Sequence, residues 1–239
     1  MARRFSTLAL LATLTMSGAS QAHQIWLEQT PDTAKMYFGE FDRNLRETSP
    51  GVLDKLPAPS AKLSDAQGDR PLSSSKTANA FTLSERAARD QTLYVEESTI
   101  PVVEYKVGGV PTRAAKTLAA RLATSSTALP PKLTLDVVPN GKTGEFKVYY
   151  KGEPQPKTRV GIIVQSGWAR EARTDDMGVV KFDLPWQGRY VLEVRYADKT
   201  PGERGGKPYD MLNYMTTLSI MQTDGLKAVP ALAPAVPNK

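Results

Sequence analysis

After the first 22 residues, hydrophobic and polar positions alternate along most of the chain. Residues 23–41 show this pattern first, because Ile25 and Leu27 occupy every second position and a turn at 30–32 leads into a second apolar run at 36–38. A period of two is typical of strands that bury one face. These residues are therefore predicted to form two strands joined by a short hairpin.

The same pattern recurs in short segments separated by Gly, Pro, Asn and Asp. Further strands are expected at 61–64, 80–83, 92–96, 102–107, 133–138, 145–150, 159–165, 168–173, 179–184, 189–196 and 211–221. A helical alternative would place many glycines and prolines inside helices, where each is costly. Residues 52–79 show little periodicity apart from the first of these strands, and are expected to be rich in loops.

In one segment the hydrophobic positions change from a period of two to the spacing of a helix. After Pro111, the stretch TRAAKTLAARLA places Ala, Leu and Lys or Arg at helical spacing, which predicts a short amphipathic helix over 111–123. The Ser-, Thr- and Pro-rich stretch at 125–131 reads as a linker. We therefore expect an all-β protein with one short helix before the linker.

Two β-sandwich-like halves are the predicted organisation, one over residues 23–128 and the other over 129–221. Many short strands at regular spacing with turn residues between them favour antiparallel sandwiches. Residues 222–239 are rich in Ala and Pro and contain no aromatic side chain. That tail is expected to be disordered.

The first 22 residues are expected to be a cleaved signal peptide. Arg3 and Arg4 precede a short apolar run at 8–16, and Ser20 and Ala22 stand at the −3 and −1 positions of a cleavage site. The run is about half of what a membrane-spanning helix needs, so the protein is not expected to span a membrane. The chain has no cysteine, which fits an exported bacterial protein of the periplasm whose stability depends on packed cores.

Charge adds little to this picture. Removing Arg3 and Arg4 from the formal net charge of +6 leaves +4 for the mature chain, and its Lys and Arg side chains are dispersed. No basic run is interleaved with aromatic residues, so nucleic acid is not an expected partner.

Cleavage after Ala22 would make His23, which is the single histidine, the first residue of the mature chain. Its α-amine and imidazole Nδ1 could then chelate one metal ion, since both nitrogens ordinarily titrate near neutral pH. Imidazole suits zinc, copper and nickel. The alternative is an ordinary chain end that happens to be a histidine.

Carboxylates are the candidates for the remaining metal ligands. Glu40, Asp42 and Glu47 follow the first hairpin and could reach the chain end, and Asp210 follows a glycine-rich loop. The alternative for the first three is a solvated acidic loop. Glu28 lies on the first strand in the opposite phase to His23, which argues against a shared site.

The second half resembles a carboxypeptidase-regulatory or transthyretin-like sandwich. The resemblance depends on F-x-V-x-Y-x-G at 146–152, T-D-x-x-G-x-V-x-F at 174–182 and G-R-Y-x-L-x-V at 188–194. Such a pattern implies a fold and says little about function.

The mature chain as a whole is similar to a more specific family. The motifs are A-H-x-x-W-L-E at 22–28, Y-F-G-E at 37–40, the Thr-Asp…Gly hairpin at 174–178 and Y-x-T-T-L-S at 214–219. They resemble periplasmic domains of unknown function grouped with nickel- and cobalt-uptake substrate-specific proteins. The resemblance implies a mature N-terminal histidine and the handling of a transition metal beside an uptake system. This chain lacks the later histidines and membrane segments of the transporter-linked relatives.

The resulting hypothesis is a periplasmic metal-binding or metal-uptake accessory protein. Its ligand would be a divalent ion of nickel, cobalt, copper or zinc, and a membrane metal transporter is the partner that the resemblance implies. No catalytic constellation is present in the sequence, because a serine–histidine–acid triad would need His23 as its base and there is no G-x-S-x-G motif. We do not expect an enzyme. The alternative is a structural or adhesion-type β-sandwich that binds a protein or a glycan.

Overall fold

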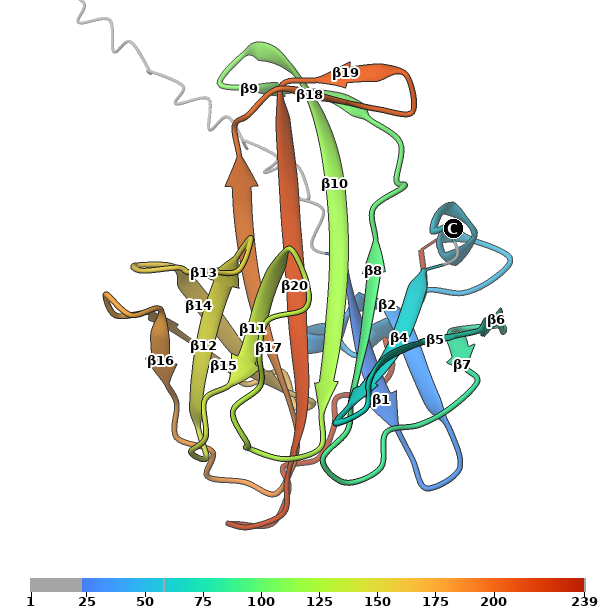
Figure 1. Ribbon diagram of the computed structural model, residues 1–239. Helices are drawn as coiled ribbons and strands as arrows, with labels where there is room; N and C mark the ends of the chain where they lie inside the picture. The colour runs from blue at the N-terminus through green and yellow to red at the C-terminus, as the bar shows by residue number, and fades with distance from the viewer. Residues whose placement is uncertain (1–22, 58, 239) are drawn as a thin grey trace, which may run out of the picture.

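The computed structural model describes residues 23–57 and 59–238 (Figure 1). The expected signal peptide lies outside the described residues. The prediction of an all-β protein is confirmed: the helical segments among the described residues are two short 3-10 turns, η1 (Phe41–Arg43) and η2 (Val52–Lys55). The kind of sandwich that each half forms stays a prediction.

The largest sheet has nine strands. Its order is β15-β14-β17-β20-β10-β8-β4-β5, with β9 paired to one end of β10. All of its neighbours are antiparallel except β10 and β20, which run parallel. The strands are β4 (Ser60–Asp65), β5 (Gly68–Leu72), β8 (Thr92–Glu97), β9 (Val103–Val107), β10 (Val110–Ala123), β14 (Arg159–Val164), β15 (Ala169–Arg173), β17 (Gly188–Asp198) and β20 (Met211–Gln222).

Three smaller sheets complete the fold. A five-stranded sheet contains β1 (Gln24–Gln29), β2 (Ala34–Glu40), β3 (Leu45–Arg46), β6 (Ser74–Lys76) and β7 (Phe81–Leu83). A four-stranded sheet contains β11 (Leu135–Pro139), β12 (Glu145–Tyr150), β13 (Glu153–Pro154) and β16 (Val179–Lys181). The third is the hairpin of β18 (Gly202–Arg204) and β19 (Lys207–Tyr209).

The predicted helix over 111–123 is wrong, because these residues belong to β10. This strand runs through the middle of the molecule in Figure 1, between β8 and β20. Leu118, Ala120 and Leu122 enter one core cluster while Ala119 and Ala123 enter others. A strand buried on both faces shows no polar face and therefore no alternation, and the tertiary packing overrides the helix propensity of its alanines.

The two main cores lie on either side of this long sheet. One is formed by β1 and β2 with β4, β8 and β10, and contains Ile25, Met36 and Leu118. The other lies between the four-stranded sheet and β14, β17 and β20, and contains Phe146 and Tyr190. β10 and β20 pair along most of their length, so one sheet contains strands from both predicted halves. The division of the chain into two domains at 128/129 stays a prediction.

Residues 52–79 hold more strand than expected, since β4, β5 and β6 all fall in this region. The disorder expected of residues 222–239 stays a prediction. The described residues of this tail lie along the surface, where the backbone of Leu226 bonds to residues 185 and 187, that of Leu232 to Gln165 and that of Ala235 to Asn44. The C-terminus thereby reaches the side of the molecule that holds η2 and β4 (Figure 1).

Candidate functional site

His23 stands immediately before β1, beside the end of β2. The backbone pairing of Gln24 with Gly39 brings the start of β1 to the end of β2, and the imidazole packs against the Phe38 ring with centroids 5.1 Å apart. The side chain is 21% exposed. The Lys116 ammonium donates to the carbonyl of His23 at 3.4 Å. The histidine is therefore held in place on three sides while its ring keeps access to solvent.

Two of the predicted carboxylates flank the ring. Glu47 Oε1 contacts His23 Nε2, and Glu40 Oε1 lies 3.8 Å from His23 Nδ1. Glu47 is fully buried and Glu40 is 12% exposed. The structure thus brings three sequence-predicted residues together at the chain end.

Local backbone geometry positions Glu47. After η1 the chain reverses at Asn44, which adopts a left-handed conformation with φ of 50°, a conformation that Asn tolerates well. β3 then pairs back on β2, and the Glu47 amide donates to the Phe38 carbonyl at 2.8 Å. This return of the chain places the Glu47 carboxylate beside Nε2 of the His23 ring.

The end of the tail completes the surroundings of Glu47. The backbone amide of Asn238 donates to Glu47 Oε2 at 3.0 Å, and the side-chain amide of Asn238 donates to Oε1. The same side-chain amide lies 3.5 Å from His23 Nε2. A buried carboxylate needs hydrogen-bond donors, and His23 and Asn238 supply them.

These contacts assign different roles to the two ring nitrogens. In the tautomer that carries its proton on Nε2, this nitrogen donates a hydrogen bond to the Glu47 carboxylate, and the Nδ1 lone pair faces Glu40. Carboxylates that orient a metal-binding histidine through its other nitrogen are a common second layer of metal sites. Since metal–ligand bonds to nitrogen and oxygen are about 2.0–2.2 Å, two ligands of one ion can lie up to about 4.2 Å apart, and the 3.8 Å between Nδ1 and Glu40 is compatible with a shared ion.

Asp42 and Asp210 lie elsewhere. Asp42 is an exposed residue of η1. Asp210 accepts hydrogen bonds from the backbone amide and guanidinium of Arg113, with a shortest distance of 2.7 Å. Those bonds to Arg113 lower the pKa of the Asp210 carboxyl. The structure brings neither of them to His23.

Glu28 is also engaged away from His23. Its carboxylate pairs with Arg46 and Arg189, both at 2.9 Å, and accepts a hydrogen bond from the indole of Trp26 at 2.8 Å. The opposite phase of Glu28 in the strand argues against a shared site with His23.

Side chains alone supply few close donors. Among residues 23–57 and 59–238, no group of three or more His, Cys, Asp or Glu residues is placed to hold a metal ion. The α-amine that cleavage after Ala22 would release is a backbone group, and it could serve as a third donor beside His23 Nδ1 and Glu40. Fit to a metal therefore depends on where the mature chain starts.

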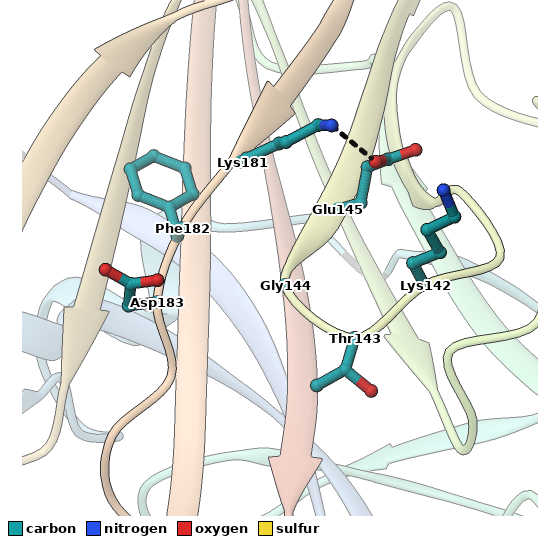
Figure 2. A pocket seen from close by; sticks show the side chains of 7 residues that line it. All are labelled: Lys142, Thr143, Gly144, Glu145, Lys181, Phe182 and Asp183. Carbon is teal, nitrogen blue, oxygen red and sulfur yellow. Dashed lines mark ion pairs between the residues drawn. The ribbon is translucent and has the colours of Figure 1, made fainter.

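A surface hollow lies away from His23. It measures about 340 Å³ and is lined by Lys142, Thr143, Gly144, Glu145, Lys181, Phe182 and Asp183 (Figure 2). Glu145, one of its charged residues, is paired with Lys181 at 3.1 Å. None of the predicted metal ligands lines this hollow.

Sequence reasoning missed Asn238. Its contact with Glu47 spans 191 positions, and an Asn in a Pro- and Ala-rich tail carries no periodic signal that would place it. A tail that is predicted to be disordered contributes no candidate site residue, so Asn238 was not predicted.

None of the helices in the described part of the chain is long and apolar enough to cross a bilayer. A family model described as a domain of unknown function matches residues 20–198. The match begins just before His23 and runs to the end of β17. No curated protein matches the chain.

Proposed function

The chain belongs to the DUF4198 family, a domain of unknown function, and on that premise we propose that it is a periplasmic protein that binds a divalent transition metal through His23. The α-amine and Nδ1 of His23 are the proposed chelate, and Glu40 is the third ligand. Glu47 orients the ring. The role is binding, as in a metal carrier or an accessory to metal uptake, and not catalysis.

The observation that carries this proposal is the pairing of His23 with a fully buried carboxylate. Glu47 sits on Nε2 and leaves Nδ1 facing Glu40. A chelate by the α-amine and Nδ1 lies within one residue, so it needs no further folding of the chain. Glu47 changes role in this proposal, from a predicted ligand to a residue that positions the ring.

Charged groups near His23 both attract and repel a cation. Glu40 and Glu47 attract a cation, while the Lys116 ammonium beside the His23 carbonyl repels it. Burial lowers the pKa of Lys116, and the neighbouring charge of Arg195 acts in the same direction. Two carboxylates against one ammonium still leave the site favourable for a divalent cation.

The proposed ligands define a class of metal and not a single element. One imidazole, one amine and one carboxylate form a nitrogen-rich set that suits nickel, copper, cobalt or zinc better than calcium or magnesium. A membrane metal transporter is the proposed partner for a carrier of this kind.

The test is calorimetric titration of the mature protein, starting at His23, with Ni(II), Cu(II), Co(II) and Zn(II). We expect one binding event that His23→Ala abolishes. A second protein with one extra residue before His23 keeps the ring and removes the amine chelate, and it should also lose the event. Asp42→Asn and Asp210→Asn are matched controls that remove a carboxylate elsewhere and should bind as the wild type does.

A wild type that binds none of the four metals would exclude the proposal and leave the non-metal β-sandwich as the better hypothesis. So would binding that survives the N-terminal extension unchanged, because the chelate requires a free amine. Mass spectrometry of the exported protein tests the premise directly, since it must show a first residue at position 23.

A further inference from the structure

β9 has a free edge and carries exposed hydrophobic side chains. Each of its five residues is exposed, and Val103, Tyr105 and Val107 are 45, 40 and 50% exposed. The strand pairs with β10 on one side, and no strand within residues 23–57 and 59–238 pairs with the other. Figure 1 shows it at one end of the molecule, close to the β18–β19 hairpin.

Unprotected strand edges are rare in monomeric proteins, because their free N–H and C=O groups pair readily with another strand. We infer that the free edge of β9 is a dimer interface, where β9 of a second copy of this chain adds in antiparallel orientation. The argument depends on which backbone groups face outward and on the two charges beside them.

The outward groups belong to Glu104 and Lys106. Glu104 pairs with Arg113 of β10, and Arg113 directs its own backbone N–H and C=O away from β9, towards Asp210. In an antiparallel ladder such a pair is not hydrogen-bonded, and both of its members point outward. Lys106 pairs with Pro111, which has no N–H to donate. Both residues therefore offer their backbone groups to the free edge.

The charges select one register. Pairing outward residues with outward residues allows Glu104 opposite Glu104, Lys106 opposite Lys106, or Glu104 opposite Lys106. Only the last avoids like charges directly across the interface, which destabilise a strand pair. It places Tyr105 on the two-fold axis and Val103 opposite Val107 of the second copy.

This register is self-complementary, as a two-fold interface requires. Arg113, which lies opposite Glu104 on β10, pairs with Asp210, and the ion pairs within the described part of one chain include neither Glu104 nor Lys106. Two copies would form two Glu104–Lys106 pairs on one face of the joined sheet, and the valines would meet on the other. On that face each Tyr105 hydroxyl accepts a hydrogen bond from Asn213 of its own chain at 3.1 Å. Lysine on an edge strand normally prevents pairing, but here the second copy supplies the carboxylate that neutralises it.

The interface is small, because a five-residue strand and its side chains bury less surface than a standard stable complex. We therefore expect a reversible dimer whose population grows with protein concentration. Sedimentation velocity of the mature wild-type protein over a range of concentrations should show a monomer–dimer equilibrium. A protein that stays monomeric at every concentration would overturn the inference.

Charge exchange tests the register. Glu104→Lys and Lys106→Glu should each weaken dimerisation about tenfold or more, because each places like charges opposite one another. The double variant Glu104→Lys/Lys106→Glu restores opposite charges and should restore the dimer. Glu153→Lys, on an exposed residue of β13, controls for the change in net charge. A folded double variant that fails to dimerise would contradict the proposed pairing.

A cross-link tests the two-fold axis. The chain has no cysteine, so Tyr105→Cys introduces a single thiol. Residues facing each other in a non-hydrogen-bonded pair have Cα atoms about 4.5 Å apart, which a disulfide can span. Under mild oxidation Tyr105→Cys should form a covalent dimer, and Val103→Cys and Val107→Cys should form much less. Equal cross-linking at all three positions would point to random collision and overturn the register.

Discussion

Arg121 of β10 and Asp136 of β11 form an ion pair from which solvent is fully excluded. Nε of the arginine lies 3.1 Å from Oδ1 of the aspartate, and both side chains have no exposed surface. The backbone amides of Lys132 and Leu133 also donate to Asp136, at 2.8 and 3.1 Å. The pair therefore ties the segment after the predicted linker to the central strand of the large sheet.

Removing one partner of this pair should be strongly destabilising. Asp136→Ala leaves two backbone amides without an acceptor and a buried guanidinium with only a long hydrogen bond to the Thr92 hydroxyl. We expect a loss of about 3–5 kcal/mol in the free energy of unfolding. Urea denaturation measures this loss. Arg121→Met/Asp136→Leu removes both charges and should recover part of it; a double variant less stable than Asp136→Ala would contradict this view of the pair.

Gly39 permits the close approach of β2 and β3 beside the candidate site. Its φ is +151°, and a Cβ there would lie 2.1 Å from the backbone oxygen of Leu45. Gly39→Ala should therefore cost about 2–4 kcal/mol of stability, measured by thermal or urea unfolding. Gly161→Ala is the control, since its Cβ would meet nothing closer than 3.9 Å. It should change stability by less than about 1 kcal/mol, and equal losses in both variants would exclude the steric explanation.

Alternation in the sequence was sufficient to predict most strands. β12 (Glu145–Tyr150) lies where the pattern places it, and β1, β2, β8 and β14 begin or end within two residues of the predicted bounds. β2, β12 and β14 bury alternate residues, whereas β1 and β8 are buried on both faces over most of their length. β10 could not be recognised in this way, because both of its faces are covered and its many alanines favour a helix in isolation.

The site was predictable only in part. A hairpin brings Glu40 and Glu47 near His23, and the sequence indicates that hairpin. The burial of Glu47 depends on the tail, whose contacts through Leu232 and Ala235 are made by backbone groups of an irregular segment. Backbone contacts of this kind leave no pattern of side-chain hydrophobicity. Pairing of Asp210 with Arg113 was likewise not indicated, since it depends on the parallel register of β10 and β20.

Hydrogen exchange can show whether the tail is ordered in solution. The amides of Leu226, Leu232 and Ala235 donate to the carbonyls of Pro185, Gln165 and Asn44. We expect them to exchange at least about tenfold more slowly than unstructured amides, because each opening must break these contacts. Exchange at the rate of a random chain at all three positions would show that the tail is free.

Glu96 should make stability depend on pH in mildly acidic solution. Burial raises the pKa of its carboxyl, against the opposing effects of a hydrogen bond from the Thr134 backbone and of the cations Arg204 and Lys62. Between the ordinary pKa and this raised value the folded state binds more protons than the unfolded state. Stability therefore falls as pH rises through that window and stays reduced above it.

Glu96→Gln removes this dependence. Relative to the wild type, the variant should gain stability at neutral pH and show no gain below the ordinary pKa of a glutamate, where both states of the wild type are protonated. Urea denaturation at a series of pH values measures the difference. Glu153→Gln on exposed β13 is the control for the loss of a carboxylate. A gain that is the same at every pH would show that packing, and not proton binding, is responsible.

Glu40 and Glu47 should respond differently to substitution if one binds the metal and the other orients His23. Glu47→Gln keeps an oxygen that can accept from Nε2–H, so metal affinity should fall by about tenfold or less, whereas Glu47→Ala removes the acceptor and should cost about 10–100-fold. At Glu40 a glutamine is a poor ligand, so Glu40→Gln and Glu40→Ala should weaken binding to a similar extent. Calorimetric titration of the four variants with one metal distinguishes these patterns. If Glu47→Gln and Glu47→Ala bind equally weakly while Glu40→Gln binds as the wild type does, the roles are reversed: Glu47 is the ligand, and Nε2 is the nitrogen that faces the metal.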